Sequence, residues 1–180
     1  MSSLAHSLVT WEEFLHLPER SEQGKRYELH DGEVVVRPPA RPLHLKLQKR
    51  IEQLLEASAA NCGVVATGFP YRPHRNLQYW IADVAYVPQA DWDALPPNEY
   101  PVYAPPLIVE VLSPSNTTVK LNRQMIVALS AGAQEFWVVD PNDRTVRVTA
   151  LNGTQVYGPG DTIPVAMFGT TISVDSIFTV

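Results

Sequence analysis

The sequence contains almost no cysteine and no long apolar run. Of its 180 residues only Cys62 is a cysteine, which excludes an internal disulfide and a cysteine-based metal cluster. No apolar run approaches the roughly 18 residues of a membrane-spanning helix, and the first residues lack the basic start and apolar core of a secretory signal. These absences predict a cytoplasmic protein without a membrane span, and the length fits one domain over residues 1–180.

The chain also has fewer basic than acidic residues. The chain has 14 lysines and arginines against 19 acidic residues, a formal net charge of −5 at pH 7, which argues against a protein that coats nucleic acid. The charge is uneven, because the stretch between Glu33 and Glu52 has no acid and holds five bases: Arg37, Arg41, Lys46, Lys49 and Arg50. This stretch could contact a phosphate backbone or form an ordinary solvated helix face, and composition leaves both readings open.

Apolar periodicity and turn residues predict a series of short elements. In chain order they are a helix opened by a capping box at Thr10–Glu13, a hairpin over 26–37 that turns at Asp31-Gly32, an amphipathic helix over 43–60, strands over 63–72, 80–87, 106–113 and 135–140, and a helix over 116–131. The strand, helix and strand across 106–140 predict a βαβ unit in a mixed sheet, hence an α/β (mixed α+β) fold.

Punctuating residues define the remaining segments. The proline-rich stretch 88–106 predicts a surface loop, long enough to cover something. Ser115 or Asn116 could cap the helix over 116–131, and Gly132 could end it. The tail over 144–180 predicts short strands with turns at Asn152-Gly153 and Pro159-Gly160, then a short final helix.

Two acids interrupt strands that are otherwise apolar. Asp83 is the only charge in WIADVAYV (80–87), and Glu110 is the only charge in PLIVEVL (106–112). A run that is apolar throughout predicts burial on both faces, where a carboxylate is rare unless it is paired or binds a metal. One such residue favours a structural salt bridge, whereas two in one domain favour a shared metal or acid–base site.

Two chemistries use such a pair. Two carboxylates, a strand carbonyl and waters suit Mg²⁺, which can activate water and stabilise charge on a phosphoryl group. Glycosidases also use two carboxylates, but this chain is short and its aromatic residues are not concentrated near either acid.

Four motifs occur in a recognisable order: YELHDGE (27–33), ADVAYV (82–87), PPLIVEVLSPSN (105–116) and GAQEFWVVDP (132–141). Together they resemble a large bacterial family of small restriction-endonuclease-like proteins within the PD-(D/E)XK nuclease superfamily. The resemblance runs from about Thr10 to Phe178. It implies a restriction-endonuclease-like mixed β-sheet flanked by helices, with additional short strands at the C-terminal end.

The resemblance also implies roles for particular residues. Asp83 and Glu110 match the metal-binding acids for Mg²⁺ or Mn²⁺, and the Val111 carbonyl would add a ligand. Glu28 matches a third acid near the site, although it could be an exposed hairpin residue. His44 matches a histidine at the start of the long helix, where a capping or packing role fits equally well.

One departure from the family pattern concerns catalysis. Gln124 stands where the family has its catalytic lysine, and Ala128 stands where it has a tyrosine one turn later. Ala82 replaces a usual proline. Lys120 lies one helical turn before Gln124, so it could supply the missing positive charge or simply be a solvent-exposed lysine.

These observations lead to a main hypothesis and two alternatives. The main hypothesis is a metal-dependent DNA endonuclease in which Lys120 or Gln124 faces the scissile phosphate and the helix stretch Lys46, Lys49 and Arg50 contacts DNA. Because cutting both strands of a duplex usually needs two sites, a homodimer is also expected. The alternatives are a catalytically degenerate nuclease-fold protein that binds DNA or a protein partner, and a carbohydrate-active enzyme.

Overall fold

The computed structural model describes residues 8–18, 25–113 and 118–180. The elements in chain order are α1 (Trp11–Leu15), β1 (Arg26–His30), β2 (Glu33–Arg37), α2 (Pro42–Ala59), β3 (Gly63–Tyr71), β4 (Gln78–Pro88), α3 (Gln89–Asp93), β5 (Leu107–Val111), α4 (Thr118–Ser130), β6 (Glu135–Asp140), β7 (Thr145–Ala150), β8 (Gly153–Tyr157), β9 (Thr162–Val165), the 3₁₀ turn η1 (Ala166–Phe168), β10 (Thr170–Ser173) and α5 (Val174–Ile177). None of the helices in these ranges is both long and apolar enough to cross a membrane.

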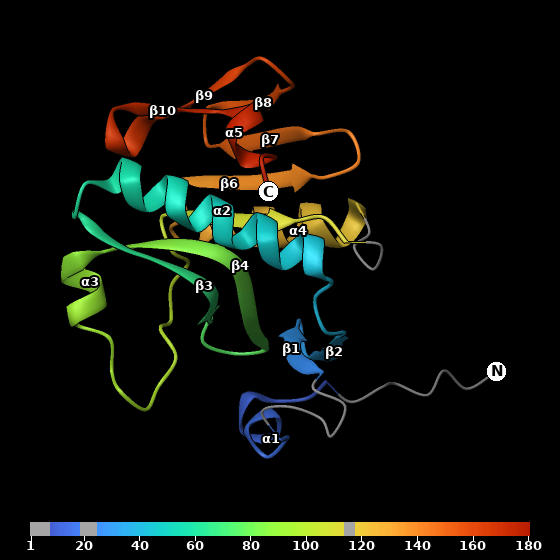
Figure 1. The fold of residues 1–180 in the computed structure, drawn as a ribbon. Helices are drawn as coiled ribbons and strands as arrows, with labels where there is room; N and C mark the ends of the chain where they lie inside the picture. Colours follow the sequence, from blue (N-terminus) through green and yellow to red (C-terminus); the bar gives the residue numbers. More distant parts are fainter. Residues whose placement is uncertain (1–7, 19–24, 114–117) are drawn as a thin grey trace.

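Eight of the described strands form one mixed sheet (Figure 1). Its order is β2-β1-β4-β5-β6-β7-β8, and β3 pairs with β4. β5 and β6 are parallel and α4 connects them, which confirms the predicted βαβ unit, while the other pairs in the sheet are antiparallel. β9 and β10 form a separate antiparallel hairpin.

Helices cover the two faces of the sheet. On one face α2 packs with α5 and the β9–β10 hairpin, and its buried residues recur every four positions, as expected for one side of a helix: Leu47, Ile51, Leu55 and Ala59. On the other face α4 buries Leu121, Gln124 and Ala128. All five residues of β5 are buried, so its unbroken apolar run does reflect burial on both faces.

Local sequence signals account for the ends of several elements. The Thr10 hydroxyl accepts a hydrogen bond from the Glu13 amide, and the Glu13 carboxylate accepts one from the Thr10 amide, which is the predicted capping box. At the β1–β2 turn both Asp31 (φ 53°) and Gly32 (φ 82°) have positive φ, as a two-residue type I′ turn requires. The suggested caps Ser115 and Asn116 lie outside the described residues.

The sequence predicted a surface loop over the proline-rich stretch 88–106, but the structure has the helix α3 within it. Its prolines flank the helix rather than interrupt it: Pro88 is the N-cap residue, where a missing N–H costs nothing. Trp92 in the helix lies 6.4 Å from the Phe69 ring, centroid to centroid. This packing holds one short helical turn in a segment whose composition favours a loop.

The two edges of β4 have different partners. One edge pairs with β3 over most of its length. The opposite edge pairs with β1 near its start, at Gln78 and Tyr79, and with β5 near its end, from Val84 to Tyr86. Residues 80–83 therefore lie between the two partners, and we call this opening between β1 and β5 the fork. The candidate site lies there.

Candidate active site

Three acidic side chains from three strands meet at the fork. Glu28 comes from β1, Asp83 from β4 and Glu110 from β5. They are buried, with exposed fractions of 1%, 9% and 0% respectively. The register pairs Val84 with Val109, and continuing it by one residue places Asp83 opposite Glu110. The two acids that the sequence singled out thus lie on neighbouring strands.

The Asp83 carboxylate is held by groups from β5 and α2. The Val111 N–H donates to its Oδ2 at 2.7 Å, and the Gln48 side-chain amide donates to its Oδ1 at 2.9 Å. His44 Nε2 lies 3.2 Å from the same Oδ1. His44 and Gln48 are four residues apart on α2, so they share one side of the helix. Three contacts from two elements fix the orientation of Asp83.

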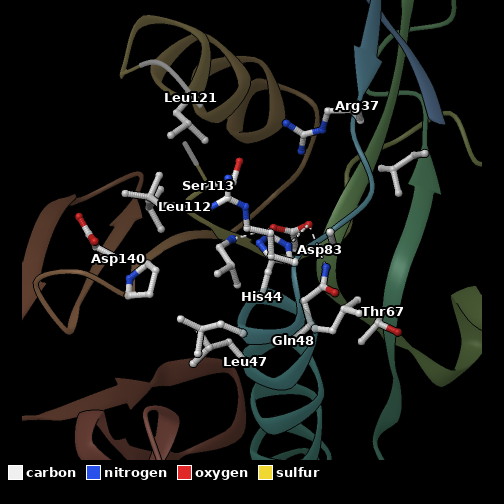
Figure 2. Close-up of a pocket in the computed structure, with 18 of the residues that line it drawn as sticks. Arg37, His44, Leu47, Gln48, Thr67, Asp83, Leu112, Ser113, Leu121 and Asp140 are labelled. Atoms are coloured by element: carbon white, nitrogen blue, oxygen red, sulfur yellow. Dashed lines mark hydrogen bonds and ion pairs between the residues drawn. The ribbon is translucent and has the colours of Figure 1, made fainter. Parts of the chain in front are cut away.

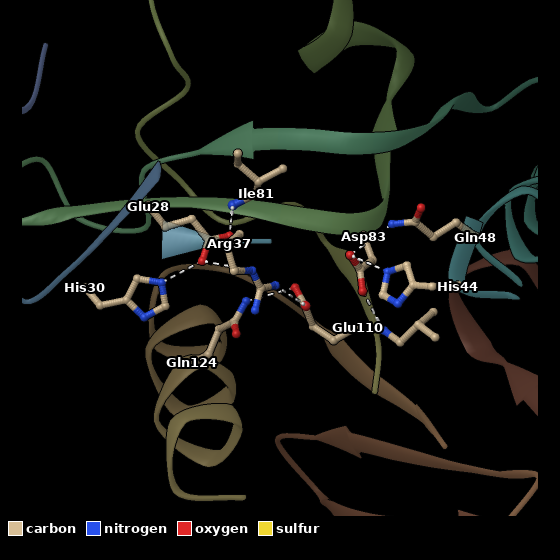
Figure 3. Close-up of polar contacts among 10 residues, drawn as sticks. Glu28, His30, Arg37, His44, Gln48, Ile81, Asp83, Glu110 and Gln124 are labelled. Carbon is tan, nitrogen blue, oxygen red and sulfur yellow. Dashed lines mark hydrogen bonds and ion pairs between the residues drawn. The ribbon is translucent and has the colours of Figure 1, made fainter. Parts of the chain in front are cut away.

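Glu110 is held by one neutral group and one cation (Figure 3). The Gln124 amide on α4 donates to its Oε1 at 2.9 Å, and Arg37 Nη2 lies 3.4 Å from its Oε2. Burial, and then the negative charge of Asp83, raise the pKa of the Glu110 carboxyl well above its usual value, although Arg37 opposes the shift. Burial and the neighbouring anion thus both favour the protonated form of Glu110 in the absence of an added cation.

Arg37, the last residue of β2, bridges the two sides of the fork. Its Nε lies 3.4 Å from Glu28 Oε2, while its Nη2 reaches Glu110. Burial disfavours the charged guanidinium, but Glu28, Glu110 and Asp83 together outweigh burial and raise its pKa further above the usual value. Arg37 thus stays positively charged and links β1 to β5.

Glu28 also satisfies backbone and side-chain groups inside the fork. Its Oε1 accepts a hydrogen bond from the Ile81 N–H at 3.2 Å, an amide of β4 within the segment between its two strand partners. Its Oε2 lies 2.9 Å from His30 Nε2. Glu28 is therefore a buried part of the site rather than the exposed hairpin residue that the sequence left open.

A cavity of about 1160 Å³ opens beside these residues (Figure 2). Segments from the β1–β2 hairpin, the start of α2, α4 and the β6–β7 turn line it, and so do Glu28 and Asp83. Four arginines stand in its wall: Arg26, Arg37, Arg41 and Arg147. Glu110 is not among the described lining residues, whereas Arg37, which contacts it, is. The cavity thus joins a buried acidic centre to a basic wall.

The basic residues predicted from sequence as site residues are not among the described residues that line the cavity. Lys120 is exposed on α4, outside the stripe that buries Gln124. Lys49 pairs with Glu52 at 2.6 Å, and Arg50 Nε donates to the Ser176 carbonyl at 2.8 Å. Neither of these two residues, nor Lys46, is among the described residues that line the cavity.

Asp83 and Glu110 have the chemistry of a divalent-cation site. Mg²⁺ prefers a few carboxylate oxygens and completes its shell with water. The described ranges hold no group of three or more His, Cys, Asp or Glu residues that could bind a metal ion, so an ion between these two acids would depend on a backbone carbonyl and water for its other ligands. Burial, and then the charge of Asp83, raise the pKa of the Glu110 carboxyl, and a divalent ion beside it would favour the ionised form. The pair therefore fits such an ion, with Arg37 as a neighbouring positive charge.

Sequence reasoning missed Arg37, His30 and Gln48 as site residues. Alternation along the hairpin places Glu28, His30 and Arg37 on one face, because Glu28 pairs with Val35 and Arg37 lies two residues further on. Gln48 could have been found from its spacing to His44. These signals needed a fixed strand register, which the apolar pattern alone does not supply.

The comparisons with known proteins show the family and the fold of the chain. A family model described as putative restriction endonuclease (Uma2) matches residues 11–175. The chain is also similar to the crystal structure of a putative nuclease belonging to DUF820 from Anabaena variabilis, with a TM-score of 0.80 and 22% identity over 95% of this chain and 98% of that one. At this identity the likeness concerns the fold, and it confirms the predicted mixed sheet flanked by helices. A search among curated proteins finds no match.

Proposed function

Because the chain belongs to the Uma2 family, described as putative restriction endonucleases, we propose that it hydrolyses phosphodiester bonds in DNA with Mg²⁺ or Mn²⁺. The observation that carries the proposal is the buried pair Asp83 and Glu110 beside an arginine-lined cavity. Two buried carboxylates on neighbouring strands suit a divalent ion, and an arginine-lined wall suits a polyanion. A homodimer would bring two such sites to one duplex.

Some residues of the site would bind the ion, and others orient the residues that bind it. Asp83 and Glu110, with the Val111 carbonyl, would hold the ion, which supplies positive charge to the phosphoryl group and makes a water more acidic. The Val111 N–H, Gln48 and His44 keep Asp83 in one orientation, and Gln124 does the same for Glu110. Attack of water oxygen on phosphorus breaks one P–O ester bond, and the leaving oxygen takes up a proton.

DNA phosphates would meet the chain along the cavity wall. Arg26, Arg41 and Arg147 stand there, and a guanidinium can bind a phosphate through two parallel N–H groups. These residues come from β1, the segment before α2, and β7. Their convergence on one cavity gives the chain a local basic surface despite its net charge of −5.

The first experiment measures metal binding through thermal stability. An ion that binds only the folded chain stabilises it by RT ln(1 + [L]/Kd), about 2.7 kcal/mol at 100 times Kd. We expect Mg²⁺ or Mn²⁺ to raise the Tm of the parent, and Asp83→Asn or Glu110→Gln to remove that rise. Glu135→Gln is the matched control, because Glu135 is also a buried acid but bonds to Trp137 away from the fork. An equal rise in all four proteins would contradict the metal site.

The second experiment measures cleavage of a fluorescent DNA duplex. Asp83→Asn should lower kcat by about 100-fold or more, because several kcal/mol of transition-state stabilisation depends on the bound ion. Glu135→Gln should cleave like the parent. Cleavage that survives Asp83→Asn unchanged would contradict the proposed centre.

A second candidate function is a nuclease-fold protein that binds DNA without cleaving it. The observation that favours it is Gln124, a neutral and buried side chain bonded to Glu110 where the family resemblance implies a lysine. This candidate predicts a metal-dependent rise in Tm and duplex binding, with no cleavage by the parent in Mg²⁺ or Mn²⁺.

A further inference from the structure

We propose that Arg37 supplies the positive charge that meets the scissile phosphate, in place of a lysine on α4. The inference rests on the nuclease function proposed above and assigns a catalytic group to it. It moves the catalytic cation from the helix to the end of the hairpin strand β2.

Gln124 occupies the position on α4 where the family resemblance implies a lysine. Its side chain is buried in the same stripe of α4 as Leu121 and Ala128, and its amide donates to Glu110 Oε1 at 2.9 Å. A neutral amide can orient a carboxylate, but it cannot neutralise charge that develops on a phosphoryl group. Gln124 on α4 therefore orients Glu110 without adding a positive charge. In the described contacts of that carboxylate the cation is Arg37, which comes from β2.

The Arg37 guanidinium lies between Glu28 and Glu110. It is 3.4 Å from each carboxylate, which is the distance of an ion pair and longer than a tight hydrogen bond. These contacts use Nε and Nη2, and a guanidinium has five N–H donors. The side chain is 25% exposed and lines the cavity (Figure 2), and Figure 3 shows its contacts with the two acids. It can thus keep its acidic partners and offer Nη1 to a phosphate oxygen.

The positive charge of Arg37 is held in position before substrate binds. Two acids from different strands hold the guanidinium in place, so little reorganisation is needed when negative charge builds up in the transition state. An arginine also remains charged at every working pH and presents a planar fork that matches phosphate oxygens. These are the properties required of a preorganised transition-state cation.

Two other roles for Arg37 make different predictions. A purely structural link across the fork would affect stability but not the chemical step. A plug that occupies the place of the metal would hinder activity, so its removal would increase both cleavage and the metal-dependent rise in Tm.

The experiment moves the charge from β2 back to α4. Parent, Arg37→Gln and Arg37→Gln/Gln124→Lys are compared by kcat and KM for cleavage of a fluorescein-labelled 20-base-pair duplex in Mn²⁺, and by Tm. We expect Arg37→Gln to lower kcat by about 10²–10³-fold with little change in KM, and the double variant to recover at least about tenfold. Arg144→Gln is the matched control, because Arg144 pairs loosely with Asp175 at 3.9 Å outside the cavity lining and should leave kcat unchanged.

Recovery in the double variant supports the proposal, because a merely structural arginine would not be replaced by a lysine on another element. An unchanged or increased kcat in Arg37→Gln, or a loss without recovery in a folded double variant, overturns it. If Arg37→Gln does not fold, Arg37→Lys keeps the positive charge and should retain kcat within about tenfold of the parent; a folded Arg37→Lys whose kcat falls by about 10² or more overturns the proposal that the charge is what acts.

A parent that cleaves nothing in Mg²⁺ or Mn²⁺ would refute the proposed function separately from the role of Arg37. Duplex affinity, measured by fluorescence anisotropy in the same proteins, then decides the role of Arg37. A several-fold loss in Arg37→Gln that Gln124→Lys restores supports its phosphate contact, and equal affinities overturn it.

Discussion

Glu110 is a buried carboxyl group whose two oxygens are engaged by unlike partners, a neutral amide and a guanidinium. Its strand neighbour Asp83 adds a second negative charge and helps to raise its pKa. Burial and this neighbouring charge both disfavour the ionised carboxylate, and Arg37 offsets them only in part. The unfavourable charge is therefore expected to appear as a pH dependence of stability.

The raised pKa of Glu110 gives the first prediction at this scale. Because the folded state binds this proton more tightly than the unfolded state, its contribution to stability is complete below about pH 4.5 and is lost as pH rises through the folded-state pKa. Glu110→Gln lacks this loss, so its free energy of unfolding relative to the parent should increase from pH 4 to pH 8, measured with urea. Glu56→Gln, at an exposed position on α2, is the control. A difference that stays constant with pH would contradict the assignment.

Individual site residues differed in how far the sequence revealed them. Asp83 and Glu110 stood out because each is the only charge in a buried strand. Arg37 did not, because its charge was grouped with the helix that follows, and its reach to Glu110 depends on how the β1 side of the sheet joins β4. Gln124 lies inside the buried stripe of α4, although it is polar, because its amide donates a hydrogen bond to Glu110.

At the scale of elements, the β1–β2 hairpin depends on one tight turn. Gly32 has φ +82°, and a Cβ at that position would lie 2.7 Å from Leu8 Cβ. The turn also sets the register that puts Arg37 at the fork. Its glycine therefore affects both the backbone of the hairpin and the packing of the N-terminal segment.

A pair of glycine variants separates these two effects. Gly160 has a similar φ of +87°, but a Cβ there meets nothing within 4 Å. In both Gly32→Ala and Gly160→Ala, the left-handed backbone conformation costs roughly 1–2 kcal/mol of stability. Only the alanine at position 32 also clashes with Leu8. We expect Gly32→Ala to lose about 1 kcal/mol or more beyond Gly160→Ala in urea unfolding. Equal losses of stability in the two variants would show that Leu8 moves aside at no measurable cost.

Elements with strong local signals were predictable, and those that depend on tertiary packing were not. The capping box, the Asp31-Gly32 turn and the amphipathic repeat of α2 specify their elements within a few residues of sequence. α3 needed the contact of Trp92 with β3, a neighbour that is distant in sequence. The fork was not predictable for the same reason, because it arises from the choice of two partners for one edge of β4.

At the scale of the whole molecule, the basic wall of the cavity is assembled from distant segments. Arg26, Arg41 and Arg147 were not recognisable as a group from their positions in the sequence. The cluster that was recognisable, Lys46, Lys49 and Arg50, lies on one helix and outside the cavity lining. Which of the two groups contacts DNA can be measured directly.

Salt dependence of duplex binding distinguishes these two surfaces. Each phosphate contact that is lost reduces the slope of log K against log salt by about one. We expect the triple alanine variant of Arg26, Arg41 and Arg147 to reduce that slope by about three, and the triple variant of Lys46, Lys49 and Arg50 to change it less. The opposite ranking would place the DNA on the α2 helix face, as the sequence analysis predicted.

The fork also divides the molecule into parts of unequal cooperativity. In the described ranges β1 pairs with β4 at two residue pairs. The contacts of Glu28 with Ile81, Arg37 with Glu110, and Asp31 with Gln78 and Arg123 add to this attachment. The hairpin can therefore open as a local unit while β5 and β6 stay folded. Such opening separates a cation on β2 from an anion on β5, and dissolved salt reduces the cost of that separation. Amide hydrogens of β1 and β2 should thus exchange faster as ionic strength rises, while those of β5 and β6 keep their rates.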